Sequence, residues 1–447
     1  MHSSSKMACN ITFANSPSPE SSTAMSCSGL TTVNPSVGGL SAALKQGDSI
    51  GNFQQHLQPG SEALRQLFVL PPGAAYFNAS YGNVPVPVMQ AQWALQLECE
   101  SDPQAWMLGN VAMKLRRVRS RLARYVRCSV EDLVLVENCT TAANAVLRSL
   151  PIPHGSVLIH LSTAYGIIKN GMAYAAAAAG ARVVEVPVEF HGHETEPRGA
   201  GGVPLAVAVA AVIEEAHGRG EEVALACFDH IASCPGALMP VFELARACSA
   251  RGVPVMLDGA HVLGQLPVDV SALEAAGVHY WISDAHKWLF SPKGSAVLWV
   301  TRSKQSQVQP AALGAAVASG ASTANFNPAA LAGLSEFERR FQYTGTRDYT
   351  PLAAIDAALD FRATLGESAI VGHNNGMAQW AQSYLASLWE TEALLPASST
   401  CAMAHVRLPP TVSSKPAADA LATALKSRYA IYVMLFALPS SPTTFWV

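Results

Sequence analysis

The strongest constraint on the fold is a regular alternation of short apolar segments with longer helix-forming segments. The segments predicted as strands are 133–136, 156–160, 182–186, 223–228, 253–257 and 279–282. Helical patterns separate them over 141–150, 165–179, 205–216, 241–250 and 270–276. Such alternation predicts an α/β fold, with a mainly parallel sheet covered by helices on both faces. A further strand over 296–300 follows a Pro-Lys-Gly turn and is expected to pair antiparallel.

Composition narrows the class of protein. The chain has 447 residues, of which 50% are hydrophobic and 14% charged, and its net charge is −3. These values are typical of a globular enzyme and argue against nucleic-acid partners. The longest apolar runs are far shorter than the roughly 20 residues of a membrane-spanning helix, so no membrane partner is expected.

The cysteines and the first fifty residues bear on the compartment. The 9 cysteines are scattered, odd in number and without a CxxC pair, which favours free thiols in a reducing environment and no metal site. Residues 1–50 are rich in Ser, Thr, Gly and Asn and are expected to be disordered. They are either a plain tail or an organellar transit segment. We therefore expect an intracellular protein, in the cytoplasm or in an organelle such as a plastid or mitochondrion.

An acid and a lysine stand at the ends of two consecutive predicted strands. Asp258 directly follows one strand, and Lys287 lies shortly after the next. Open α/β sheets bind ligands at the carboxyl ends of their strands. A lysine can form a Schiff base with pyridoxal phosphate (PLP), and an aspartate can keep the pyridine nitrogen protonated so that the ring accepts electrons. The alternative is a capping aspartate and a solvated lysine.

Two other segments offer groups for a phosphate. Thr140 and Thr141 lie where a strand gives way to a helix, so their hydroxyls and N–H groups can bind an anion there. The alternative is that Thr140 caps the helix. Gly345 and Thr346 offer a second phosphate contact, or form an ordinary turn.

Polar and aromatic residues follow two more strands. Tyr165 comes after the strand over 156–160 and can stack on a pyridine ring, or pack in the core. Asp229 and His230 end the strand over 223–228. They can contact substrate, or form a hydrogen-bond network within their loop.

These motifs, in this order, resemble those of class V, fold type I PLP enzymes. Within that class they are most similar to the branch of isopenicillin N epimerase-like proteins, plant-type L-cysteine desulfhydrases and hercynylcysteine sulfoxide lyases. The matching stretches are 76–82, 137–142, 162–166, 228–233, 257–261, 283–288 and 345–348. The resemblance extends from about residue 51 to about residue 410.

The resemblance implies a role for each motif residue. Lys287 would be the Schiff-base lysine and would remove the substrate Cα proton, Asp258 would partner the pyridine nitrogen, and His261 would neighbour the phenolic oxygen. The other implied roles are ring stacking by Tyr165, phosphate binding by Thr140, Thr141, Ser283 and His286, contact of Gly345 and Thr346 with the phosphate of a neighbouring subunit, and substrate contacts near Asn78, Ser80, Asp229 and His230. The resemblance thus implies a homodimer. It also implies that the substrate is an amino acid.

The same resemblance predicts the domain organisation. A PLP-binding large domain with an N-terminal arm is expected over 51–350, around a sheet of the seven-stranded type. A smaller α+β domain is expected over 351–447, with a strand over 406–409 and a helix over 417–428, and is expected to be incomplete. Relatives carry an arginine in a later strand that pairs with the substrate carboxylate. Arg407 and Arg428 lie before that place in this chain.

Several reactions can follow removal of the Cα proton. Epimerisation, transamination, loss of a β-thiolate and sulfur transfer to a protein thiolate are all open. Sulfur transfer needs a cysteine on a mobile loop, and Cys401 instead leads into a predicted strand. The segment 229–233 most resembles the desulfhydrase branch. We predict a C–S lyase acting on L-cysteine or a cysteine conjugate; the alternatives are an epimerase, an aminotransferase or a catalytically impaired paralogue.

Overall fold

The seven segments predicted as strands pair into one sheet. A computed structural model describes residues 57–77, 81–192, 196–314 and 332–447, so the predicted tail over 1–50 lies outside it. The strands are β2 (Leu133–Val136), β3 (Val157–Leu161), β4 (Arg182–Val186), β5 (Val223–Asp229), β6 (Val255–Asp258), β7 (Val278–Asp284) and β8 (Ala296–Val300). Their order across the sheet is β2-β8-β7-β6-β5-β3-β4. The predicted fold class is confirmed.

The strand directions place the polar residues that follow the strands along one edge. Only β8 runs antiparallel to its neighbours β2 and β7, as the Pro-Lys-Gly turn predicts. The other pairs are parallel, so their carboxyl ends meet at the same edge. Asp229 pairs in register with Asp258 across β5 and β6. Side chains in register on adjacent strands share a face, so these two acids point to the same side.

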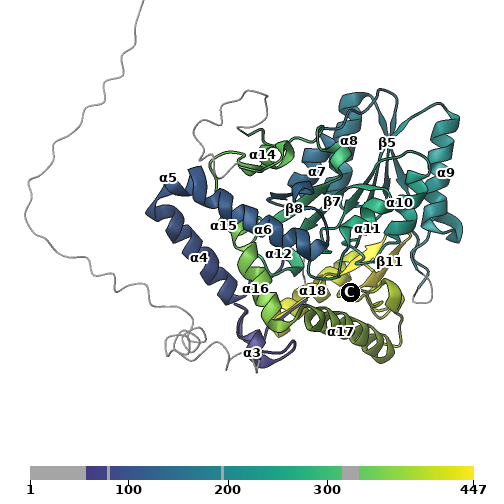
Figure 1. Cartoon of the computed structure of the whole chain (residues 1–447). Coiled ribbons are helices and arrows are strands. Elements are labelled where there is room, and N and C mark those ends of the chain that lie inside the picture. Colours follow the sequence, from purple (N-terminus) through teal and green to yellow (C-terminus); the bar gives the residue numbers. More distant parts are fainter. Residues whose placement is uncertain (1–56, 78–80, 193–195, 315–331) are drawn as a thin grey trace, which may run out of the picture. The chain divides into compact units, whose positions relative to one another are not determined.

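Helices cover both faces of the sheet (Figure 1). One face packs against α7 (Cys139–Leu147) and α8 (Gly166–Ala179). The other face packs against α6 (Val111–Val126), α9 (Leu205–Gly218), α10 (Val241–Ser249) and α11 (Val270–Ala275). All residues of β2, β3, β6 and β8 are buried, as expected for strands that are covered on both sides.

Helical segments precede and follow the sheet. Before it lie α3 (Glu62–Arg65), α4 (Val86–Ser101) and α5 (Pro103–Ala105), and the short α12 (Ala285–Trp288) lies between β7 and β8. After the sheet lie α14 (Glu336–Gln342), α15 (Thr350–Ala353), α16 (Ile355–Leu365), α17 (Glu367–Leu388) and α18 (Lys415–Tyr429). The helix predicted over 417–428 is therefore present. Among the described residues, no helix combines the length and apolar character needed to cross a bilayer.

Short strands complete the C-terminal part. They are β9 (Ile431–Tyr432), β10 (Phe436–Leu438) and β11 (Ser441–Trp446), and β9 pairs in parallel with β1 (Ala75–Tyr76) of the N-terminal arm. β10 and β11 form an antiparallel hairpin. The strand predicted over 406–409 is shorter in the structure, where Val406 and Arg407 form single antiparallel bridges to Ala393 and Trp446. The segment lies between two neighbours, because Val406 exchanges backbone hydrogen bonds with Val447 on one side and the Arg407 N–H donates to the Glu392 carbonyl on the other.

The N-terminal arm contacts the backbone of α12. Gly82 has a positive φ of 56°, and a Cβ placed there would lie 2.1 Å from the His286 carbonyl oxygen and 2.5 Å from that of Lys287. Only glycine allows so close an approach. The Lys293 ammonium donates to the Gly82 carbonyl at 2.9 Å and so holds the arm in this position.

We expect Gly82→Ala to displace α12 and destabilise the protein. Forcing a methyl group into a packed contact costs about 1–3 kcal/mol, to which the strain at positive φ adds. Chemical denaturation measures the loss. Gly73→Ala is the matched control, because Gly73 has a φ of 71° but no atom within 4 Å of the added Cβ. Equal losses in the two variants would show that backbone strain alone, and not the contact with α12, is responsible.

Candidate functional site

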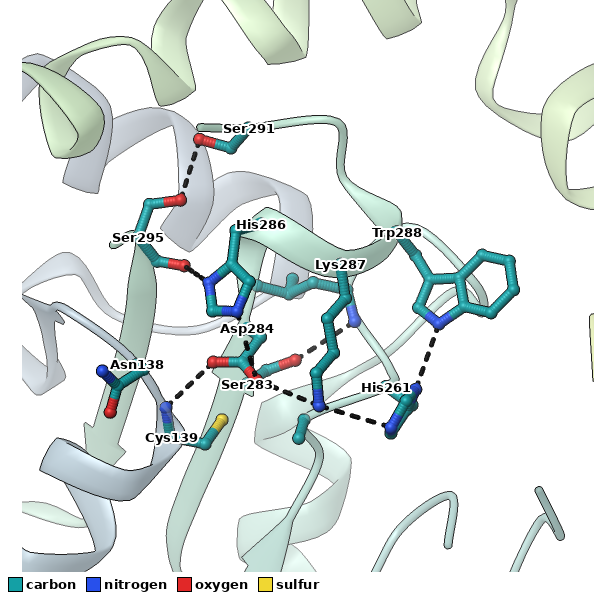
Figure 2. A network of polar contacts seen from close by, with 12 residues as sticks. Asn138, Cys139, His261, Ser283, Asp284, His286, Lys287, Trp288, Ser291 and Ser295 are labelled. Atoms are coloured by element: carbon teal, nitrogen blue, oxygen red, sulfur yellow. Dashed lines mark hydrogen bonds and ion pairs between the residues drawn. The ribbon is translucent and has the colours of Figure 1, made fainter. Parts of the chain in front are cut away.

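Lys287 lies between an acid and a histidine. Its Nζ is 3.2 Å from Asp284 Oδ2 and 3.3 Å from His261 Nε2 (Figure 2). The lysine belongs to the short helix α12, which begins directly after β7, and its side chain is only 15% exposed. His261 follows β6 and is buried. Two loops that leave neighbouring strands thus converge on one amine.

Asp258 ends β6 on the same edge and is buried. Its Oδ1 accepts a hydrogen bond from the Ala260 N–H at 3.0 Å. Burial raises the pKa of the Asp258 carboxyl to about 6, against the opposing effect of the Lys287 charge. A nearby cation stabilises the charged form of a carboxyl group. Such a carboxylate is suited to keeping a proton on a basic ring nitrogen.

Asp284 is a functional candidate that sequence reasoning missed. Its Oδ1 accepts from the Cys139 N–H at 2.9 Å, and Oδ2 faces Lys287. The predicted strand ended at residue 282, whereas β7 runs to Asp284. Asp258 was identified because it stands at the carboxyl end of a strand. Asp284 stands at the carboxyl end of β7 in the same way, which the shorter predicted strand did not reveal. His286 lies 3.8 Å from the same carboxylate, and its Nδ1 contacts the Ser295 carbonyl at 3.0 Å.

The first turn of α7 retains donors for an anion. The Cys139 N–H bonds to Asp284, and the Thr141 N–H bonds to the Asn138 side chain at 2.8 Å. Asn138, and not Thr140, is therefore the N-cap residue. Among the described bonds, the Thr140 N–H has no acceptor, and both threonine hydroxyls lie in the first turn. These groups fit an external phosphate.

Ser283 joins the two loops. It is fully buried, and its hydroxyl donates to the Gly259 carbonyl and accepts from the Leu263 N–H at 3.1 Å. The structure thus gives this hydroxyl partners in the loop that follows Asp258. The single O–H of Ser283 is therefore used within the fold, and its predicted contact with the phosphate stays a prediction.

Two other predicted segments lie beside loops at this edge of the sheet. Tyr165 precedes α8 and is 49% exposed. The Gly345 segment lies beside the β2–α7 loop, because Arg347 forms an ion pair with Glu137 at 2.9 Å. In that segment Thr346 is exposed, and its hydroxyl bonds to the Tyr343 hydroxyl at 2.7 Å. The predicted substrate contacts Asn78 and Ser80 lie outside the described residues.

Asp229 and His230 are both buried. Asp229 Oδ2 accepts from the Thr163 hydroxyl at 2.7 Å, and burial together with the Asp258 charge raises the pKa of Asp229 to about 7. Burial lowers the pKa of His230 to about 4, and its Nδ1 has no hydrogen-bond partner among the described residues. Asp229 is thus hydrogen-bonded to the loop that carries Tyr165, and it lies close enough to Asp258 for that charge to raise its pKa.

We expect Asp229 to make the folded state less stable as pH rises from about 4 to about 7. The folded state retains its proton up to about pH 7, whereas the unfolded chain releases it near pH 4. The stabilisation is therefore complete below about pH 4 and is lost as pH rises through the folded pKa. Urea denaturation across this range, without added PLP, should show wild type losing stability relative to Asp229→Asn.

Other groups, including His230, titrate in the same range, so only the difference between the two proteins isolates Asp229. Asp419→Asn is the control, since Asp419 is an exposed partner of Lys415 on α18. The assignment would be contradicted if the free energy of unfolding of wild type, minus that of Asp229→Asn, stays constant or increases as pH rises.

Comparison with known proteins assigns the chain to a family. The class-V aminotransferase family model matches residues 84–433. The L-cysteine desulfhydrase-like protein lolT1 of Epichloe uncinata is 29% identical over 379 residues, which are 80% of each chain. The isopenicillin N epimerase of Streptomyces clavuligerus is 26% identical over 361 residues, 78% of this chain and 84% of that protein.

A solved structure shares the fold. The complex of the cystine C-S lyase C-DES with cysteine persulfide superposes with a TM-score of 0.67 at 21% identity, covering 83% of this chain and 92% of that one. The carboxyl of Asp258, the amine of Lys287 and the donors in the first turn of α7 are the types of group that the ring nitrogen, the aldehyde and the phosphate of PLP require. The chain belongs to the class-V aminotransferase family, and PLP is its cofactor.

Proposed function

We propose that this protein is a PLP-dependent C–S lyase that acts on L-cysteine or a cysteine conjugate. The observation that carries the proposal is the position of the Lys287 amine, between Asp284 and His261 and within the electrostatic reach of Asp258. When bound, PLP delocalises the negative charge that develops at the substrate Cα. With cysteine, breaking the Cα–H and Cβ–S bonds and adding one water gives sulfide, pyruvate and ammonia.

The chain's own groups divide the work. Lys287 would bind the cofactor and, once the substrate amine replaces it, would remove the Cα proton as a general base. Asp258 would hold a proton at the ring nitrogen. Asp284, 3.2 Å from Nζ, would stabilise the ammonium that forms when Lys287 takes up the proton.

Sulfur transfer to a protein thiolate is disfavoured by the position of Cys401. This cysteine is buried in the core, and burial raises the pKa of its thiol to about 12. A nucleophilic thiolate needs access and a lowered pKa. The names of relatives such as lolT1 support a desulfhydrase-type reaction instead. The match to isopenicillin N epimerase makes epimerisation the second candidate.

Incubation of the purified protein and PLP with L-cysteine tests the proposal. We expect sulfide, pyruvate and ammonia in equal amounts. Racemised cysteine without sulfide would establish the epimerase instead. Formation of mercaptopyruvate and a new amino acid, only with an added keto-acid acceptor and without sulfide, would establish an aminotransferase. Cofactor binding without any turnover of amino acids would identify an impaired paralogue.

We also propose a homodimer, in which Gly345 and Thr346 reach the phosphate of the neighbouring subunit. Thr346 is exposed, and α4 presents an exposed apolar stripe of Met89, Trp93 and Leu97. Exposed apolar stripes of this kind are typical of subunit interfaces. Light scattering should give a mass about twice the 47.0 kDa of the chain. A monomer that binds PLP would contradict this assignment of the Gly345 segment.

A further inference from the structure

Trp288 and Lys287 contact the two nitrogens of one imidazole ring. The Trp288 indole Nε1 lies 3.3 Å from His261 Nδ1, and Lys287 Nζ lies 3.3 Å from His261 Nε2 (Figure 2). Trp288 directly follows Lys287 in α12. An indole N–H can only donate a hydrogen bond, so Nδ1 must accept here. The contact with Trp288 therefore determines whether Nε2 of His261 donates or accepts a hydrogen bond.

His261 is held as a neutral ring. Burial is the main cause that keeps the pKa of His261 well below its usual value. A neutral imidazole carries a single N–H. Because Nδ1 accepts from Trp288, this proton must reside on Nε2, which faces Lys287. The backbone of His261 is also held, since the Gln265 amide donates to its carbonyl at 2.7 Å.

We propose that Trp288 is a positioning residue that fixes His261 as the Nε2–H tautomer. The ring then presents a donor, and not a lone pair, to the atoms beside Lys287 Nζ. This inference rests on the proposed role of Lys287 as the lysine that binds PLP. Without the indole donor, the proton can move to Nδ1, and Nε2 can then accept from the lysine ammonium and keep it protonated. A protonated amine cannot attack the aldehyde of PLP, so attachment of the cofactor should slow.

The tautomer can be observed without any cofactor. The full chain labelled with ¹⁵N in its histidine rings should show a pyridine-type Nδ1 and a pyrrole-type Nε2 for His261, assigned by their loss in His261→Gln. In Trp288→Phe the two signals should move toward each other or exchange character. Trp380→Phe is the control, because Trp380 is an exposed tryptophan on α17 that stacks on Tyr384. A pyrrole-type Nδ1 in wild type, or identical spectra in wild type and Trp288→Phe, would overturn the proposal.

A second variant, Trp288→Gln, keeps the test decisive if Trp288→Phe does not fold. Trp288→Gln loses the ring but keeps a side-chain N–H that can donate to Nδ1. It should retain the Nε2–H form, whereas a role in packing alone predicts that it behaves no better than the phenylalanine variant. Thermal denaturation of both variants separates loss of the fold from loss of the donor.

The kinetic consequence is measured with PLP added. We expect Trp288→Phe to slow growth of the visible cofactor band by about 3–10-fold, the effect of one hydrogen bond. In a His261→Gln background the same substitution should change the rate less than twofold, because glutamine presents an amide N–H without help from Trp288. Equal slowing in both backgrounds would show that Trp288 does not act through His261. If no band forms even in wild type, the proposed function fails, while the tautomer result still stands on its own.

Discussion

Lys287→Ala should abolish both the covalent attachment of PLP and turnover of amino acids. The variant lacks the amine that bonds the cofactor and the base that removes the Cα proton, and a positioned general base alone contributes about 10²–10⁴-fold. Borohydride reduction followed by peptide mapping should find the reduced cofactor on the peptide containing Lys287 in wild type. Absorbance near about 420 nm, the region expected for a PLP–lysine bond, should be absent from the dialysed variant.

The matched control is Lys415→Ala, which removes an exposed lysine that pairs with Asp419 on α18. It should bind PLP and turn over substrate as wild type does. Reduced cofactor recovered on any other lysine of the wild-type protein would refute the assignment of Lys287.

Asp258→Asn should retain PLP binding through Lys287 but lose most of its activity. Asparagine is close in shape and can still accept from the Ala260 N–H, so the loop should persist. It carries no charge to hold a proton on the ring nitrogen. Loss of one partner of a buried charge pair costs about 3–5 kcal/mol, which corresponds to a rate loss of roughly 10²–10⁴-fold. Steady-state sulfide release measures the effect.

Asp269→Asn controls for the loss of a carboxylate elsewhere, since Asp269 caps α11 at the surface and asparagine caps helices equally well. Its activity should match that of wild type. Activity of Asp258→Asn within a few-fold of wild type would show that another group holds the ring proton.

The sequence predicted the sheet and its reactive edge because both depend on local patterns. Buried strands are continuous apolar runs, and the residues that end them are the first polar ones, so Asp258 and Lys287 could be placed before the structure was known. The strand bounds differ mainly at the carboxyl ends. β7 continues through Ser283 and Asp284, because these polar side chains find partners within the fold.

The contacts around the lysine could not be predicted, because they join segments far apart in the chain. The bond from Trp288 to His261 spans 27 residues, and that from Cys139 to Asp284 spans 145. No periodicity or spacing encodes such pairs. The extent of the strand predicted over 406–409 depends likewise on pairing with other segments, and in the structure only Val406 and Arg407 form bridges, to Ala393 and Trp446.

The hydroxyl of Ser283 has a consequence for how substrate enters. It bonds to the backbone on both sides of the Asp258 loop while its own chain continues directly into α12. Hydrogen bonds therefore join the loop after Asp258 to the segment before Lys287, and we expect this block to move as a unit. Any opening that admits a substrate must occur in the surrounding segments, such as those that carry Tyr165 and Thr346. Efforts to change substrate preference should accordingly be directed at those segments, with the block left intact.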